Sequence, residues 1–223
     1  MSDSPFDASQ IEPFDASQVE PLTFLGHIRK RPRMYVDPLS GDAVLGSALA
    51  GLLGQDTGGA TTIVVDVVIE SDGSASVADD GPGLPVTMIR GKTHAEMILG
   101  MALTPGHNRL AIANALSDWF IADVHTAGFQ WRQRFEQGQP TTPFERVATT
   151  SQTFTRVRFL PSTELLTDGP IALDLHRRSI KDVMYAIRPG DDPPTKGTAD
   201  IRLHDKRSRT SGEWTVARLL PGW

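Results

Sequence analysis

Cysteine is absent from this sequence of 223 residues, and its six histidines are scattered without the spacing of metal ligands. Disulfides and thiolate metal sites are therefore excluded, and no bound metal is expected. Long hydrophobic runs are also missing, because the longest, residues 43–53, is too short and too rich in glycine to span a bilayer. No signal peptide is recognisable. These absences predict a soluble, cytoplasmic protein with no membrane partner.

Basic residues are missing from the first 26 residues, whose five acidic side chains alone account for the net charge of −5. The remainder is neutral, so no direct nucleic-acid partner is expected. The octapeptide PFDASQIE at 5–12 recurs as PFDASQVE at 13–20. Two copies are too few for a solenoid. We therefore predict that residues 1–21 form a flexible acidic arm, which either docks on a partner or stays disordered.

Residues 22–223 are predicted to form one domain, since the chain's length and its 39% hydrophobic content suit a single core. A hairpin is expected around the turn Asp72-Gly73. Local patterns predict strands at 63–69, 75–78, 120–125, 129–136, 145–150, 155–160, 199–204 and 213–220, and helices at 39–54, 110–120 and 171–187. This order indicates an α+β domain with one mixed sheet and helices on one face.

The stretch V-A-D-D-G-P-G-L-P at 77–85 contains the strongest candidate for a functional residue. The second strand of the hairpin delivers Asp79 to its end. The two glycines let the backbone leave the strand sharply and approach a ligand closely, and the two prolines stiffen the exit. Taken alone, the motif also fits an ordinary Asp-Gly turn.

Six motifs in a fixed order carry a family resemblance. They are R-K-R-P-x-M-Y at 29–35, V-x-D-D-G-x-G-L-P at 77–85, N-A-L-S at 114–117, W-R-Q-R-F-E-x-G at 131–138, R-F-L-P at 158–161 and I-R-L-H-D-K-R at 201–207. From about residue 22 to 215 the chain resembles the N-terminal ATP-binding domain of the DNA gyrase B and topoisomerase IV B subunits. The resemblance implies the Bergerat (GHKL) fold, a two-layer α+β sandwich, without the family's transducer domain.

The resemblance implies that the part of the family's pocket that holds adenine and ATP-competitive inhibitors is retained. The matching positions are Asp79 for the aspartate that accepts the adenine amino group, Thr155 beside it, Gly83, Leu84 and Pro85 for the floor and wall, and Arg132 for the arginine at the mouth. Ser47 and Gly51, small residues of the helix predicted at 39–54, are expected to line the same pocket.

The part of the pocket that handles phosphate and metal is expected to be lost. In the family, the helix equivalent to 39–54 carries a glutamate base and an asparagine that binds Mg²⁺, whereas this segment contains neither residue type. The glycines of the phosphate lid are replaced around His107, and the arginine of the family's D-D-G-R-G turn is Pro82. We therefore expect no ATP turnover and no cofactor.

Three functions stay open. The first is a pseudoenzyme that binds a small, partly apolar molecule, in a sequestration, resistance or biosynthetic role. The second is an enzyme that reuses the pocket for ATP-independent chemistry on a metabolite, with Asp79, His107 or Asp42 as acid or base. The third is an interaction module that acts on a topoisomerase, as a homodimer or with a gyrase subunit. A decayed relative whose Asp79 only caps a turn is the remaining alternative.

Overall fold

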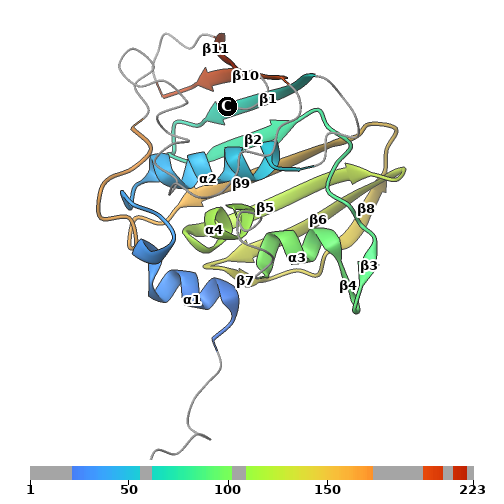
Figure 1. Cartoon of the computed structure of the whole chain (residues 1–223), viewed down its shortest axis with the longest axis horizontal. Helices are drawn as coiled ribbons and strands as arrows, with labels where there is room; N and C mark the ends of the chain where they lie inside the picture. Colours follow the sequence, from blue (N-terminus) through green and yellow to red (C-terminus); the bar gives the residue numbers. More distant parts are fainter. Residues whose placement is uncertain (1–21, 56–61, 102–108, 173–197, 208–212, 220–223) are drawn as a thin grey trace, which may run out of the picture.

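The computed structural model describes residues 22–55, 62–101, 109–172 and 198–207, and the backbone of a strand at 213–219 (Figure 1). Three predictions fall outside these residues: the arm at 1–21, His107, and all but the first two residues of the helix expected at 171–187. The division into an arm and one domain therefore stays a prediction.

A nine-stranded mixed sheet forms one layer of the molecule, in the order β11-β10-β1-β2-β9-β5-β6-β7, with β8 also paired to β6. The strands are β1 (Thr62–Ile69), β2 (Ala75–Asp79), β5 (Ser117–Thr126), β6 (Phe129–Glu136), β7 (Gln139–Pro140), β8 (Glu145–Thr149), β9 (Phe154–Pro161), β10 (Thr198–Asp205) and β11 (Glu213–Leu219). The β1–β10 pair is parallel, and the other described pairs are antiparallel. A small separate hairpin joins β3 (Met88–Ile89) to β4 (Lys92–Thr93).

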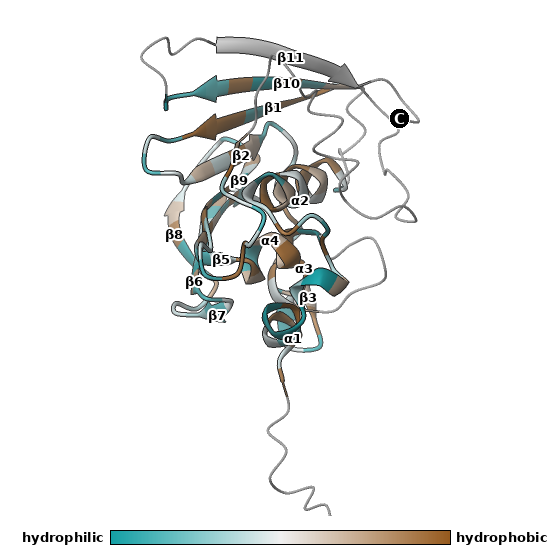
Figure 2. Cartoon of the chain, turned by 90° about the vertical axis from the view of Figure 1, so that its left-hand side faces the viewer, coloured by the Kyte–Doolittle hydropathy of each residue, from teal (hydrophilic) through white to brown (hydrophobic). Residues whose placement is uncertain are grey.

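Helices cover one face of this sheet, as Figures 1 and 2 show. They are α1 (Phe24–Lys30), the 3-10 helix η3 (Pro32–Met34), α2 (Gly41–Leu53), α3 (His94–Gly100) and α4 (Arg109–Ala115). Within the described residues, none is long and apolar enough to cross a membrane. The opposite face of the sheet is left open by the described helices (Figure 2).

The core lies between the helices and the sheet, and α2 is its centre. All residues of α2 except Asp42 and Ala50 are buried, although the helix contains three glycines. One of these glycines explains the close packing. A Cβ on Gly51 would lie 2.7 Å from the Leu110 Cγ of α4, so the two helices can approach this closely only without a side chain at this position. Tertiary packing therefore holds a helix whose own propensity is poor.

The helix predicted at 110–120 is too long by one and a half turns. It ends at Ala115, and the chain enters β5 at Ser117, so Phe120 lies in a strand. The reason is the run of aromatic and β-branched residues after 117, which favours a strand. The guanidinium of Arg29 also donates to the carbonyls of Ala115 (2.7 Å) and Ser117 (3.2 Å), and so satisfies groups that the end of the helix exposes.

Candidate functional site

Asp79 lies at the end of β2, between two neighbouring strands. In the ladder it stands opposite Val65 of β1 and Thr155 of β9. Its Oδ1 accepts a hydrogen bond of 2.7 Å from the backbone N–H of Gly81. A Cβ on Gly81 would lie 2.8 Å from that same oxygen, so the first glycine of the motif gives the carboxylate its room. The hairpin and its turn thus place Asp79 as the sequence predicts.

Burial raises the pKa of Asp79 to about 6, because a partly dry environment disfavours the charged carboxylate. The backbone N–H groups of Gly81 and Thr155 act in the opposite direction, and the charge of Asp80 adds a smaller upward contribution. The group is therefore mostly ionised at pH 7 and can accept hydrogen bonds there. Near pH 6 it exchanges its proton readily.

The turn after Asp79 is fixed by its second glycine and by Thr155. Gly83 has a φ of +79°, and a Cβ there would lie 2.4 Å from the carbonyl oxygen of His125. The next residue, Leu84, donates its N–H to the Thr155 hydroxyl at 3.1 Å, and both side chains are buried. The carbonyl of Pro85 then accepts from Ala95 at the start of α3. The structure therefore brings these predicted residues together around Asp79.

The residues predicted on α2 have other neighbours. Ser47 is fully buried and donates its hydroxyl to the Ala43 carbonyl at 2.8 Å, within its own helix. Gly51 packs on α4, as described above. Asp42 accepts a hydrogen bond from the Ala172 N–H in the first turn of the helix. Figure 1 shows β2 running beside α2 towards the far end of the helix, so Asp42 and Asp79 do not share a site.

Arg132 is not brought together with Asp79. In the ladder, Asp79 is aligned through Thr155 and Val124 with Trp131, and neighbouring residues of a strand point to opposite faces. Arg132 therefore lies on the open face of the sheet, where its Nε donates to Asp123 at 2.6 Å. Trp131 is the residue of β6 that is aligned with Asp79, on the same face of the sheet.

Two of the motifs that carry the family resemblance make contacts that stabilise the fold. The side-chain amide of Asn114, in the N-A-L-S motif, donates to the Leu99 carbonyl and is fully buried, and so joins α4 to α3. Arg29 of the R-K-R-P motif joins α1 to the start of β5. A capping box of Thr93 and Glu96 marks the start of α3, and the pattern T-x-x-E is the signal that finds it.

Comparison with known proteins places these features in a family context. No family model matches the sequence. The B subunit of the type 2 topoisomerase of Aquifex aeolicus is 27% identical over 188 residues, which are 72% of this chain and 23% of the relative. A novobiocin-resistant DNA gyrase B subunit of Streptomyces niveus is 30% identical over 203 residues, which are 82% of this chain and 28% of the relative. By sequence, the chain is similar to part of the gyrase B subunit.

Solved structures agree with the sequence comparison. The topoisomerase IV ATP-binding domain of Francisella tularensis, in complex with a small-molecule inhibitor, has a TM-score of 0.67 at 22% identity, over 85% of this chain and 94% of that one. The 43K ATPase domain of Thermus thermophilus gyrase B, in complex with an aminocoumarin, has a TM-score of 0.67 at 25% identity, over 90% of this chain and 52% of that one. The predicted GHKL fold is confirmed, although this gyrase-B-like chain spans less than a third of the two curated relatives described above.

Proposed function

We propose that this gyrase-B-like domain does not hydrolyse ATP and uses the site around Asp79 to bind a small, partly apolar molecule. One observation carries the proposal: a carboxylate with a raised pKa stands at the end of a buried strand, beside a helix that offers no glutamate and no asparagine. The site keeps an anchor for a hydrogen-bond donor. It lacks the groups that activate water and bind Mg²⁺ in the family that the chain resembles.

The chemistry of Asp79 supports a neutral or weakly charged ligand. A carboxylate offers about four lone-pair positions, and the N–H groups of Gly81 and Thr155 use only part of them. The remaining capacity suits an N–H or O–H group of a ligand. The surrounding Val65, Val77 and Leu84 side chains are buried and apolar. This combination of apolar walls and a few polar anchors is typical of small-molecule sites.

The composition of α2 supports the absence of ATP turnover. Its acidic residue, Asp42, lies in the first turn and accepts from the Ala172 N–H. The rest of the helix consists of Gly, Ala, Val, Leu and Ser, and nearly all of it is buried. The base and the metal ligand therefore have no counterparts on this helix.

The relatives indicate which ligands to test first. Two similar structures contain an inhibitor, in one case an aminocoumarin, and one relative is a novobiocin-resistant gyrase B. We therefore propose that the ligand shares its anchor with such inhibitors, and that the protein sequesters or senses it. A cytoplasmic location, and association with a second copy or with a gyrase subunit, are proposals on the same basis.

The first test is a thermal-shift titration with aminocoumarins and other gyrase B inhibitors. We expect at least one compound to raise the melting temperature, and Asp79→Asn to weaken its binding roughly tenfold to a hundredfold, since losing a charged acceptor costs about 1.5–3 kcal/mol. Asp80→Asn is the matched control, because this neighbouring carboxylate is exposed and accepts from the Val64 N–H. No shift with any compound, or equal binding by Asp79→Asn, would show that the surroundings of Asp79 are not the site.

The pKa of Asp79 favours acid–base catalysis as a second candidate function, because a pKa of about 6 suits a general base near neutral pH. Asp42 lies at the other end of α2, and His107 is outside the described residues. Mass spectrometry of a bound ligand after incubation separates the two functions. A ligand recovered unchanged supports binding alone, and a transformed ligand whose conversion requires Asp79 supports the enzyme.

A further inference from the structure

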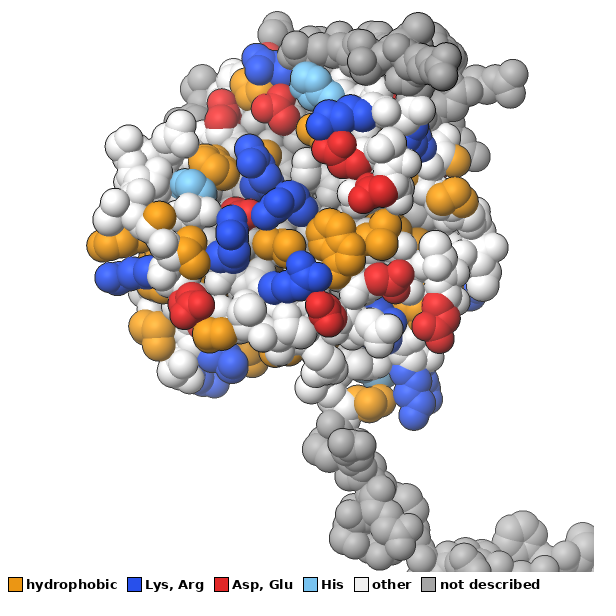
Figure 3. All heavy atoms as spheres, turned by 180° about the vertical axis from the view of Figure 1, so that it is seen from behind, with side chains coloured by type: hydrophobic (Ala, Val, Ile, Leu, Met, Phe, Trp, Pro, Cys, Tyr) orange, Lys and Arg blue, Asp and Glu red, His pale blue; other side chains and the backbone are white. Residues whose placement is uncertain are grey.

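On the open face of the sheet, the two strands that flank β5 carry four arginines. We call this surface the arginine face: Arg132 and Arg134 of β6, and Arg156 and Arg158 of β9. Their even spacing puts each pair on one side of its strand, and the ladder aligns both pairs with the odd residues of β5 between them. Figure 3 shows basic side chains gathered near the middle of this face, with hydrophobic side chains beside them.

A single buried carboxylate organises the cluster. Asp123 of β5, whose side chain is 7% exposed, accepts from Arg132 Nε at 2.6 Å and from Arg158 at 3.0 Å. The two arginine side chains are 46% and 42% exposed. Each guanidinium has five N–H donors, so most of the donors of the two groups remain available to a ligand. The carboxylate therefore fixes both guanidinium groups in place without satisfying them.

The arginine face has an excess of positive charge. Arg134 pairs with the exposed Glu136, and Arg156 lies over the Phe154 ring and makes no ion pair among the described residues. Glu145 of β8 stands opposite Arg132 in the ladder, so four arginines lie with three carboxylates, on β5, β6 and β8, and the net charge is +1. Trp119 and Ile121 of β5 lie on the same face and are only partly buried. The surface thus combines fixed cations with apolar patches, which suits an acidic peptide with aromatic side chains.

We propose that the acidic tandem repeat at residues 5–20 of the same chain binds to the arginine face. The repeat supplies four carboxylates, no basic residue, and one phenylalanine in each copy. Its charge is opposite to that of the face, and its phenylalanines suit the arginine and tryptophan side chains. The proposal is independent of the site around Asp79, which lies on the other side of the sheet.

The geometry of the chain allows this contact. Residue 22 lies directly before α1, and α1 is joined to the start of β5 through Arg29, which binds the carbonyls of Ala115 and Ser117. The chain therefore enters the described fold close to the end of the strand that carries Trp119. Sixteen extended residues span roughly 53 Å, and the ten residues of β5 about 34 Å, so the repeat is long enough to cross the face.

The absence of cysteine makes a direct test possible in the full chain. Ala16→Cys, labelled with bimane, reports the proximity of a tryptophan, because indole quenches this dye on contact. We expect the emission to rise when Trp119 is replaced by Phe, when Arg156 is replaced by Glu, and when salt screens the charges. The same responses in Ala8→Cys would assign both copies of the repeat to the face.

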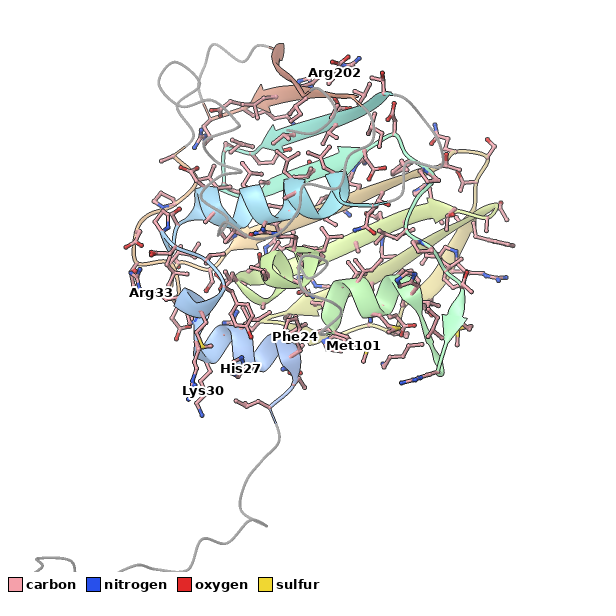
Figure 4. The ribbon with its side chains drawn as sticks, in the orientation of Figure 1. Phe24, His27, Lys30, Arg33, Met101 and Arg202 are labelled. Carbon is pink, nitrogen blue, oxygen red and sulfur yellow. The ribbon has the colours of Figure 1, made fainter. Side chains whose placement is uncertain are left out.

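The matched control is Arg202→Glu. Arg202 is an exposed arginine of β10, and Figure 4 shows it far from α1, at the other end of the molecule. This variant should leave the emission unchanged, and circular dichroism should show that all variants keep the fold. The proposal would be overturned if bimane emission did not change in Trp119→Phe and Arg156→Glu, or if it rose equally in Arg202→Glu. Quenching that disappears on dilution would also overturn it, because the repeat would then come from a second copy.

Discussion

Asp79 shows how one residue links the stability of this domain to its proposed role. Its pKa is about 6 in the fold and 3.8 without the fold, so the folded protein holds the proton more tightly. The contribution of Asp79 to the free energy of unfolding is therefore largest below pH 3.8, and it is lost as the pH rises through 6. The buried charge is a cost that the fold carries at neutral pH, and a bound donor would reduce it.

We therefore predict that Asp79→Asn raises the free energy of unfolding at pH 7.5 by up to about 3 kcal/mol, and that this gain vanishes near pH 4. The amide oxygen can still accept from the Gly81 N–H, so the turn should survive. Urea denaturation at the two pH values measures both effects. An equal effect of the substitution at both values would contradict the assigned pKa.

Gly83 and Gly73 form a matched pair for a second prediction. Both have a positive φ. A Cβ added to Gly83 would lie 2.4 Å from the carbonyl oxygen of His125, whereas a Cβ added to Gly73 would meet nothing within 4 Å. Gly73→Ala should cost about 1 kcal/mol from backbone strain alone. Gly83→Ala should cost roughly 3 kcal/mol or more, since the turn must also move. Chemical denaturation of both variants measures the difference. Equal losses of unfolding free energy would show that the turn at Gly83 can shift at little cost.

At the scale of elements, the stability of α2 depends more on its packing against α4 than on its own helix propensity. Gly51→Ala should destabilise the protein by about 1–3 kcal/mol, because the new methyl group collides with Leu110, although alanine is the better helix former. Gly100→Ala in α3 is the control, since its Cβ would meet only ordinary contacts at 3.8 Å and should be neutral or stabilising. The melting temperature should therefore fall for Gly51→Ala and stay the same or rise for Gly100→Ala.

The elements also show what the sequence could and could not predict. Alternation with a period of two predicts most of the larger strands, because the residues on their inward faces are mostly apolar. The helix before β5 was predicted too long, since Leu116 and Phe120 fit a helical pattern as well as a buried strand. Arg132 was assigned to the pocket from its motif alone. Residues of a strand alternate between its two faces, so Trp131 and Arg132 lie on opposite faces. This alternation, applied to the sequence, would have placed Arg132 away from the pocket.

At the scale of the whole molecule, the proposed loss of the phosphate end of the family's site leads to a prediction about ATP. We predict no measurable ATP turnover, and ATP affinity weaker than about 1 mM in the presence of Mg²⁺. Isothermal calorimetry and a phosphate-release assay check this, with the ATPase domain of a gyrase B relative run in parallel as the positive control. Micromolar binding of ATP by this chain would require another group to replace the missing glutamate and asparagine.

The parallel pairing of β1 with β10 has a consequence for synthesis on the ribosome. Thr62 pairs with Thr198 and Ile69 with Asp205, so the parallel partner of β1 is made more than a hundred residues after it. Until then, a strand of sequence TIVVDVVI presents an unpaired hydrophobic edge, the kind of edge that recruits other chains. Nascent chains released before residue 198 should therefore aggregate, whereas chains that include β10 can close the sheet.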